Sequence, residues 1–217
     1  MRVLINDTVE VPPSADPDAM VQAVYGSNGP LVRWNMVSTL DGSAVGADGG
    51  SGSINNAADF RVFGFLRGWA DVVVVGAGTA RAEGYRPLRP NRWSALREGR
   101  SDAPLLAVVS RRAELPDTLQ GQPKERVLLL HGAKLGGRDI VNTLRTLGHQ
   151  RILFEGGPRL AAQFLDAGII DELCLTIVPT LVGGDGTRIT QGPGVDQGAQ
   201  LASLLEEDGT LLSRWRL

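Results

Sequence analysis

The hydrophobic positions of this chain fall into short apolar runs, each followed by glycine or polar residues. Residues 71–75 end in four successive valines, and residues 105–109, 127–130 and 151–154 form similar runs. Runs of this kind are typical of parallel strands that are buried on both faces of a sheet. Stretches with helical spacing separate them, so the pattern predicts an α/β fold with a mixed, mostly parallel sheet and flanking helices.

Further elements are predicted around these runs. Asn55 or Asn56 can cap a helix that runs to about Trp69. Its apolar stripe consists of Phe60, Phe63 and Leu66, with Val62 and Phe65 beside them. The other predicted elements are a strand over 31–37, helices over 138–147 and 158–168, a strand over 171–178, and two short strands within 199–217 that form an antiparallel edge. Residues 1–30 are expected to be an N-terminal lead-in packed on one domain that spans 31–217.

Composition narrows the classes of function. The chain has 217 residues with 42% hydrophobic residues, which is enough for one large core. Its net charge of −2 gives no general attraction to nucleic acid or to an anionic membrane. The single cysteine, Cys174, excludes an internal disulfide and a cysteine-rich zinc site. Neither a secretory signal nor a membrane-spanning run is found, so we expect a cytoplasmic protein that acts on a small molecule and holds no metal.

Two glycine-rich turns follow apolar runs and precede predicted helices. The first begins at Gly76-Ala77-Gly78-Thr79, and the second at Gly156-Gly157-Pro158. Glycines at the end of a parallel strand let the backbone approach a ligand, and the next helix offers free N–H groups that suit a phosphate. Because Arg81 stands where a third glycine would be, the first turn is not a Rossmann fingerprint. The alternative is that both are plain strand-to-helix turns.

Polar groups near these turns favour hydride transfer. Ser110, Arg111 and Arg112 follow the 105–109 run, where a hydroxyl and two guanidinium groups suit the 2′-phosphate of NADPH; the alternative is a solvated basic turn. Acid–base groups are few. Asp41 and Glu155 are the two carboxylates placed where a ligand could meet them, and the alternative for Asp41 is a turn residue. Few titratable groups beside phosphate-binding turns fit an enzyme whose nicotinamide cofactor carries the chemistry.

Several motifs occur together in a fixed order from about residue 31 to the end of the chain. They are Asn35-Met36-Val37-Ser38-Thr39-Leu40-Asp41-Gly42, Leu66-Arg67-Gly68-Trp69-Ala70-Asp71, Val74-Val75-Gly76-Ala77-Gly78-Thr79, Leu153-Phe154-Glu155-Gly156-Gly157-Pro158, Ile170-Asp171-Glu172-Leu173 and Pro179 to Gly184. In combination they resemble the reductase domain of riboflavin biosynthesis. The resemblance implies a dihydrofolate-reductase-like fold, a homodimer, and NADPH-dependent reduction of 5-amino-6-(5-phosphoribosylamino)uracil to the ribitylamino product.

The resemblance also implies roles for particular residues. Asp41 and Glu155 would be the catalytic residues that face the substrate. The substrate would be bound by Asn35, Ser51, Ser53, Arg67, Arg89 and Arg92. NADPH would be bound by Ser38, Gly76, Gly78, Thr79, Glu83, Ser110, Arg111, Gly156, Gly157, Pro158, Arg159 and Leu160.

Two segments depart from the family pattern. Residues 51–55 lack the aromatic residue that the family often has, and residues 82–88 replace the common Asp-Asp/Asn-Pro-x-Leu stretch. Both border the expected substrate, so two alternatives stay open. One is a reductase of another ring, such as a dihydrofolate, for which Asp59 is the only acid in the first helical region. The other is a non-catalytic relative that binds a nucleotide.

Overall fold

The computed structural model describes residues 1–7 and 16–217. The strands of this part of the chain are β1 (Arg2–Asn6), β2 (Leu31–Thr39), β3 (Val72–Gly76), β4 (Leu105–Ser110), β5 (Val127–His131), β6 (Arg151–Phe154), β7 (Glu172–Val178), β8 (Gln200–Glu207) and β9 (Thr210–Arg216). The helices are α1 (Pro17–Tyr25), α2 (Ala57–Trp69), α3 (Ala77–Ala82), α4 (Gly137–Thr146) and α5 (Pro158–Asp166), with the 3₁₀ turns η1 (Ser94–Arg97) and η2 (Asp117–Leu119). Among the described residues, no helix has the length and apolar character needed to cross a membrane.

All described strands form one sheet in the order β1-β8-β9-β7-β2-β6-β3-β4-β5. The strands from β7 to β5 in this order pair in parallel, whereas β9, β8 and β1 are joined by antiparallel pairing. The prediction of a mixed, mostly parallel sheet is therefore confirmed. Its centre is buried on both faces, and the four valines of β3 have no exposed surface.

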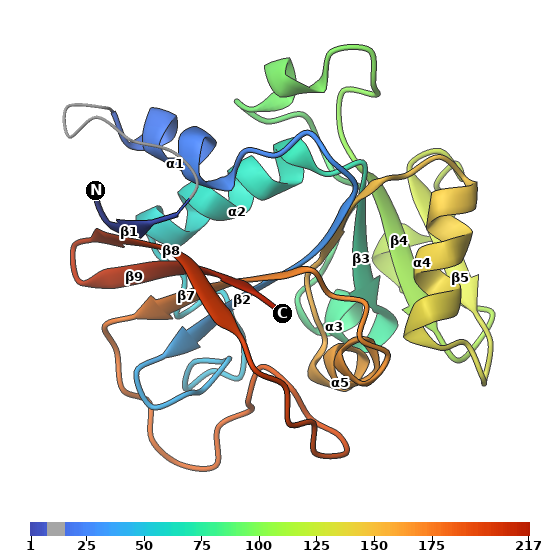
Figure 1. The fold of residues 1–217 in the computed structure, drawn as a ribbon. Helices are drawn as coiled ribbons and strands as arrows, with labels where there is room; N and C mark the ends of the chain where they lie inside the picture. The colour runs from blue at the N-terminus through green and yellow to red at the C-terminus, as the bar shows by residue number, and fades with distance from the viewer. Residues whose placement is uncertain (8–15) are drawn as a thin grey trace.

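Helices cover the sheet on two sides (Figure 1). The side chains of α1, α2 and α3 pack on one face, against residues such as Val73 and Val75. The side chains of α4 and α5 pack on the other face, against residues such as Val72 and Val74. Because successive residues of a strand point to opposite faces, the valine run of β3 serves both cores.

Two parts of the structure differ from the sequence expectations. The N-terminal segment contributes β1, which pairs with β8 and forms the outer edge of the sheet beyond the β8–β9 hairpin. In α2, the buried side chains include Val62, Phe65 and Leu66, whereas Phe60 is exposed and Phe63 is partly exposed. The expected core stripe through Phe60 and Phe63 is therefore wrong, because packing against the sheet selects the neighbouring positions.

Candidate active site

The two glycine-rich turns lie side by side at the carboxyl ends of β3 and β6. These strands are parallel neighbours, and the N–H of Gly76 donates to the carbonyl of Gly156 at 3.0 Å. Gly156 has a φ of 103°, a conformation that favours glycine, and a Cβ atom on Gly157 would collide with Oγ1 of Thr79. The sequence prediction that both turns serve one edge of the sheet is therefore consistent with their close contact.

These turns have the features of an anion site. Gly157 caps α5 without a side-chain hydrogen bond, so the backbone N–H of Arg159 in the first turn has no capping side chain within the described residues. Gly76 caps α3 in the same way. Free N–H groups and the positive end of α5 suit a pyrophosphate, so the residues present fit a nicotinamide dinucleotide. Gly78, Pro158 and Leu160 belong to the first turns of these same helices.

Ser110 and Arg111 lie one strand further along the same edge. β4 pairs with β3, so Ser110 at its end is close to the turn that begins at Gly76. The Ser110 hydroxyl accepts a hydrogen bond from the backbone N–H of Arg112 at 3.1 Å, and Arg111 is exposed. The expected contact of this pair with the adenosine end of a dinucleotide stays a prediction.

Glu155 directly precedes the second glycine turn and is held by two side chains from other elements. Arg67 of α2 donates from Nε to Oε1 at 2.7 Å and from Nη2 to Oε2 at 2.6 Å. Tyr85, in the loop after α3, donates its hydroxyl to Oε2 at 2.8 Å. The side chain of Glu155 is only 2% exposed, whereas that of Arg67 is 24% exposed. The carboxylate of this bidentate ion pair is therefore shielded from water.

Aromatic rings surround the guanidinium of Arg67. It lies 4.0 Å from the centre of the Phe63 ring and 5.6 Å from that of Tyr85. Burial opposes the charge of Arg67, but the neighbouring Glu155 carboxylate outweighs it and the pKa of Arg67 is raised. Burial and the same carboxylate raise the pKa of Tyr85 well above its usual value. Arg67 is therefore charged and Tyr85 neutral throughout the physiological range.

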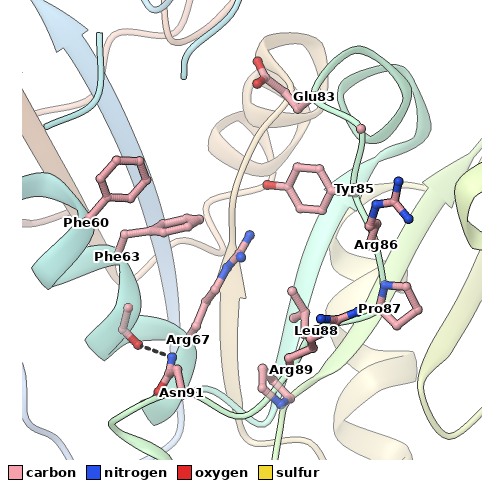
Figure 2. Close-up of a pocket in the computed structure, with 13 residues that line it drawn as sticks. Phe60, Phe63, Arg67, Glu83, Tyr85, Arg86, Pro87, Leu88, Arg89 and Asn91 are labelled. Carbon is pink, nitrogen blue, oxygen red and sulfur yellow. Dashed lines mark hydrogen bonds between the residues drawn. The ribbon is translucent and has the colours of Figure 1, made fainter. Parts of the chain in front are cut away.

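A cavity of about 830 Å³ opens beside this cluster, between α2 and the loop that follows α3. Figure 2 shows Arg67 extending from α2 toward the ring of Tyr85, with Phe60 and Phe63 on the helix side. The loop side carries Arg86 and Arg89. The cavity thus combines aromatic surface with cationic groups, which suits a flat ring that bears an anionic substituent.

The structure brings some of the expected substrate residues together and separates others. Arg67 and Arg89 line the cavity. Glu83, which was expected to bind the cofactor, lines the same cavity. Ser51 lies near it, because its N–H donates to the carboxylate of Glu83 at 3.1 Å. Arg92 does not line the cavity; it pairs with Asp18 of α1 at 3.0 Å.

The remaining expected residues lie on β2 and on the loop after it. Asn35 and Ser38 are buried in β2, which lies between β7 and β6 in the sheet. The Ser38 hydroxyl donates to the carbonyl of Thr39 at 3.3 Å. The Ser53 hydroxyl donates to Asp48 at 2.6 Å within its own loop.

Asp41 joins two loops. Its carboxylate accepts hydrogen bonds from the Thr39 hydroxyl and from the backbone N–H groups of Val182 at 3.1 Å and Gly183 at 2.6 Å. The hydrogen bond from Thr39, followed by that from Gly183, lowers the pKa of Asp41. The side chain is ionised at neutral pH and connects the end of β2 to the loop after β7.

Two cavity residues, Phe63 and Tyr85, were not predicted as site residues from the sequence. Arg86 belongs to the arginine-rich loop 86–97, which was interpreted as either a grip for a substrate phosphate or a plain polar loop. Phe63 was taken for a core residue because α2 has apolar residues on more than one face. Tyr85 lies in the segment that departs from the family pattern, and this departure was the only signal that pointed to it. Its contacts with Arg67 of α2 and with Glu155 are long-range, so no local pattern could have revealed them.

The sheet, its two helical layers and the paired turns define a domain with the dihydrofolate-reductase-like fold. A pyrimidine reductase-like protein from Corynebacterium diphtheriae has the same fold, with a TM-score of 0.75 at 24% identity over 90% of this chain and 97% of that one. The RibD C-terminal domain family matches residues 30–211. The chain therefore belongs to the RibD C-terminal domain family.

Curated relatives share this domain. The riboflavin biosynthesis protein RibD of Mycobacterium tuberculosis is 30% identical over 163 residues, which cover 74% of this chain and 45% of that protein. The chain thus spans about half the length of the RibD proteins it matches. The 2,5-diamino-6-ribosylamino-4(3H)-pyrimidinone 5′-phosphate reductase of Methanothermobacter thermautotrophicus is 27% identical, over 81% of this chain and 90% of that protein.

Proposed function

We propose that this protein is an NADPH-dependent pyrimidine reductase of riboflavin biosynthesis. Its substrate would be 5-amino-6-(5-phosphoribosylamino)uracil, whose ribosyl group opens and takes up one hydride and one proton to become ribityl. The observation that carries the proposal is the carboxylate of Glu155, which Arg67 and Tyr85 hold between the cavity and the second glycine turn. Family membership supports the same class of reaction, because the relative from Methanothermobacter, matched over 81% of this chain and 90% of that protein, is named a reductase of the related 2,5-diamino-6-ribosylamino-4(3H)-pyrimidinone 5′-phosphate.

The cofactor would lie along the carboxyl edge of the sheet. Gly76, Thr79, Gly156 and Gly157 would hold its pyrophosphate, and Ser110 with Arg111 would hold the 2′-phosphate. When bound, NADPH supplies the hydride for the reduction. The protein side chains would then hold the ribosyl carbon close to the nicotinamide and exclude water. This task requires a fixed substrate rather than a reactive side chain.

The substrate would occupy the cavity beside Arg67. Phe63 and Phe60 line the cavity and offer flat apolar surface for the pyrimidine ring. Glu155 lies behind the lining residues Arg67 and Tyr85, where its carboxylate would accept a hydrogen bond from a ring N–H or a ribosyl hydroxyl of the substrate. Asp41 would contribute by holding the loop after β7 at the mouth of the site. Its carboxylate is ionised, so it accepts hydrogen bonds and does not supply the proton.

The phosphate of the substrate would be held by Arg86 and Arg89. Both side chains line the main cavity and also an adjoining cavity of about 310 Å³, where Arg126 contributes a third guanidinium. Three guanidinium groups around a small cavity match a phosphate. Arg92, which pairs with Asp18, is the matched control because it is a nearby arginine outside the cavity.

The test follows the loss of nicotinamide absorbance with purified protein. The uracil substrate, its 2,5-diamino precursor and dihydrofolate are offered in parallel, each with NADPH. We expect turnover of a phosphoribosylamino-pyrimidine, with a KM raised about tenfold or more in Arg89→Ala, a loss of one charged contact. The Arg92→Ala control should match the wild type. Bound NADPH with no turnover of either pyrimidine would refute the proposal.

The alternative substrates have specific outcomes. Turnover of dihydrofolate alone would indicate a reductase of another ring. The structure offers little support for this, because Asp59 is buried against β7 and does not line the cavity. NADPH binding without turnover of any of the three substrates would indicate a non-catalytic relative.

We further propose that the protein is a cytoplasmic homodimer. Leu173, Leu175 and Ile177 alternate along β7 with buried residues and are only partly covered. A second copy packed on this face would bury them. Light scattering coupled to size-exclusion chromatography would test the dimer, and a monomer at micromolar concentration would contradict it.

A further inference from the structure

Tyr85 occupies a fixed place in the loop that lines the cavity. Its N–H donates to the carbonyl of Ala80 at 2.9 Å, which anchors it to the end of α3. Its carbonyl accepts a hydrogen bond from the hydroxyl of Thr118 at 2.7 Å, which anchors it to η2. The backbone on either side of the ring is therefore held, and the hydroxyl can be aimed at a defined point.

That point is one oxygen of Glu155. Arg67 occupies one acceptor position on each oxygen, and Tyr85 occupies another on Oε2. A carboxylate has about four acceptor positions, so these three contacts leave roughly one. The three contacts fix the plane of the carboxylate and hence the direction in which the remaining position points.

Tyr85 is not placed to act as an acid toward a substrate. Its hydroxyl proton is engaged with Glu155, and burial together with that carboxylate raises its pKa. Tyr85 is also connected to the cationic side of the cavity through the backbone. The loop continues from Tyr85 to Arg86 and then to Arg89, and both arginines line the two cavities. A shift of the ring would therefore move the cationic side of the cavity relative to Glu155.

We propose that Tyr85 is a positioning residue that ties the loop carrying Arg86 and Arg89 to Glu155, and so sets the distance between the anion-binding and hydrogen-bonding ends of the cavity. The proposal rests on the function proposed above. It assigns to Tyr85 a part in selecting ligands that present a donor group and an anionic group at matching separation. The affinity for a ligand that lacks either group would not depend on the hydrogen bond between Tyr85 and Glu155.

The kinetic test compares Tyr85→Phe with the wild type. The variant keeps the ring and loses the hydroxyl, and we expect the KM of the phosphorylated substrate to rise about tenfold, as for loss of one hydrogen bond to a charged group. The dissociation constant of NADPH should stay unchanged. The matched control is Tyr25→Phe, which removes the hydroxyl of the other tyrosine, the buried last residue of α1. A purely structural effect would lower the active fraction and kcat at constant KM.

A spectroscopic test does not need turnover. The chain has two tyrosines, so the Tyr25→Phe variant contains Tyr85 as its only tyrosine. In this variant the intensity ratio of the tyrosine doublet in the resonance Raman spectrum reports whether the Tyr85 hydroxyl donates or accepts a hydrogen bond. We expect the signature of a strong donor, which Glu155→Gln in the same background should weaken.

The outcomes separate this proposal from the proposed function. A wild-type protein that turns over neither pyrimidine refutes the proposed function, while a strong-donor signature still supports the tie. An unchanged KM in an active Tyr85→Phe variant overturns the positioning role. A doublet that does not respond to Glu155→Gln overturns the contact itself.

Discussion

Replacing Asp59 by asparagine is expected to stabilise the protein at neutral pH. Asp59 lies in the first turn of α2 and is 3% exposed. It forms a side-chain hydrogen bond with Thr176 of β7, whereas its Oδ1 atom has no partner among the described residues. Burial raises the pKa of this carboxyl from its usual value of 3.8 to about 6. At pH 7 the folded protein therefore holds a poorly compensated buried anion.

The size and sign of the effect follow from proton linkage. A folded pKa above the unfolded one means that the folded state binds the proton more tightly, so stability falls as the pH rises from about 4 to about 6 and is constant above that. A difference of about two pKa units corresponds to about 3 kcal/mol. The favourable interaction of the anion with the start of α2, about 0.5 kcal/mol, is lost in the variant. We expect a net gain of about 2 kcal/mol at neutral pH, which declines toward zero near pH 4.

Urea unfolding at several pH values measures this difference. The four tryptophans provide a fluorescence signal, and circular dichroism provides an independent probe. The informative quantity is the difference in unfolding free energy between Asp59→Asn and the wild type as a function of pH. A difference that stays constant from acid to neutral pH would refute the reasoning, because it would show that the ionisation of Asp59 carries no cost.

Three other substitutions test neighbouring parts of the argument. Asp71→Asn should destabilise the protein. Burial alone would raise the pKa of Asp71, but hydrogen bonds from the backbone of Arg151 and from Arg100 outweigh it and lower the pKa. The unfolding free energy of the variant in urea should therefore fall by about 1–3 kcal/mol at neutral pH, and by less below about pH 4. Gly157→Ala should lower stability by about 1–3 kcal/mol in the same assay, and Thr79→Ala should recover part of that loss because it removes the colliding Oγ1; equal, additive losses would contradict the clash. Arg111→Ala should weaken NADPH binding about tenfold in a fluorescence titration and leave NADH binding unchanged, whereas equal effects on both cofactors would exclude a 2′-phosphate contact.

The strands of the sheet centre could be predicted because they are buried on both faces. Such burial requires a continuous apolar run, and a run such as that of β3 is visible in the sequence. β1 was not predicted, because an edge strand pairs on one side only and mixes exposed and half-buried residues. Phe60 and Phe63 were misplaced for a related reason: α2 carries apolar residues around most of its surface, and only packing decides which of them face the sheet.

The paired turns of the site could be predicted, but the contacts around Glu155 could not. Each turn is local, and its glycines follow directly after a strand, so sequence order alone points to one edge of a parallel sheet. Glu155, by contrast, meets Arg67 from 88 residues away and Tyr85 from 70 residues away. The resemblance to the family pointed to Arg67 and Glu155 separately. Their direct pairing, and the part played by Tyr85, depend on how α2 crosses the sheet.

The ion pair between Arg67 and Glu155 is better explained by ligand binding than by stability. Taking two charges out of water costs several kcal/mol, on the order of what their attraction returns, and a well-packed apolar pair in the same space is often as stable or more so. A fold that needed only a packed interior would gain little from this pair. Beside the cavity, however, the pair would provide an acceptor of fixed direction next to the turns that suit a dinucleotide. On the function proposed above, Arg67, Tyr85 and Glu155 would place the hydrogen-bonding end of the substrate site against the cofactor end, which is the arrangement that hydride transfer between two bound small molecules requires.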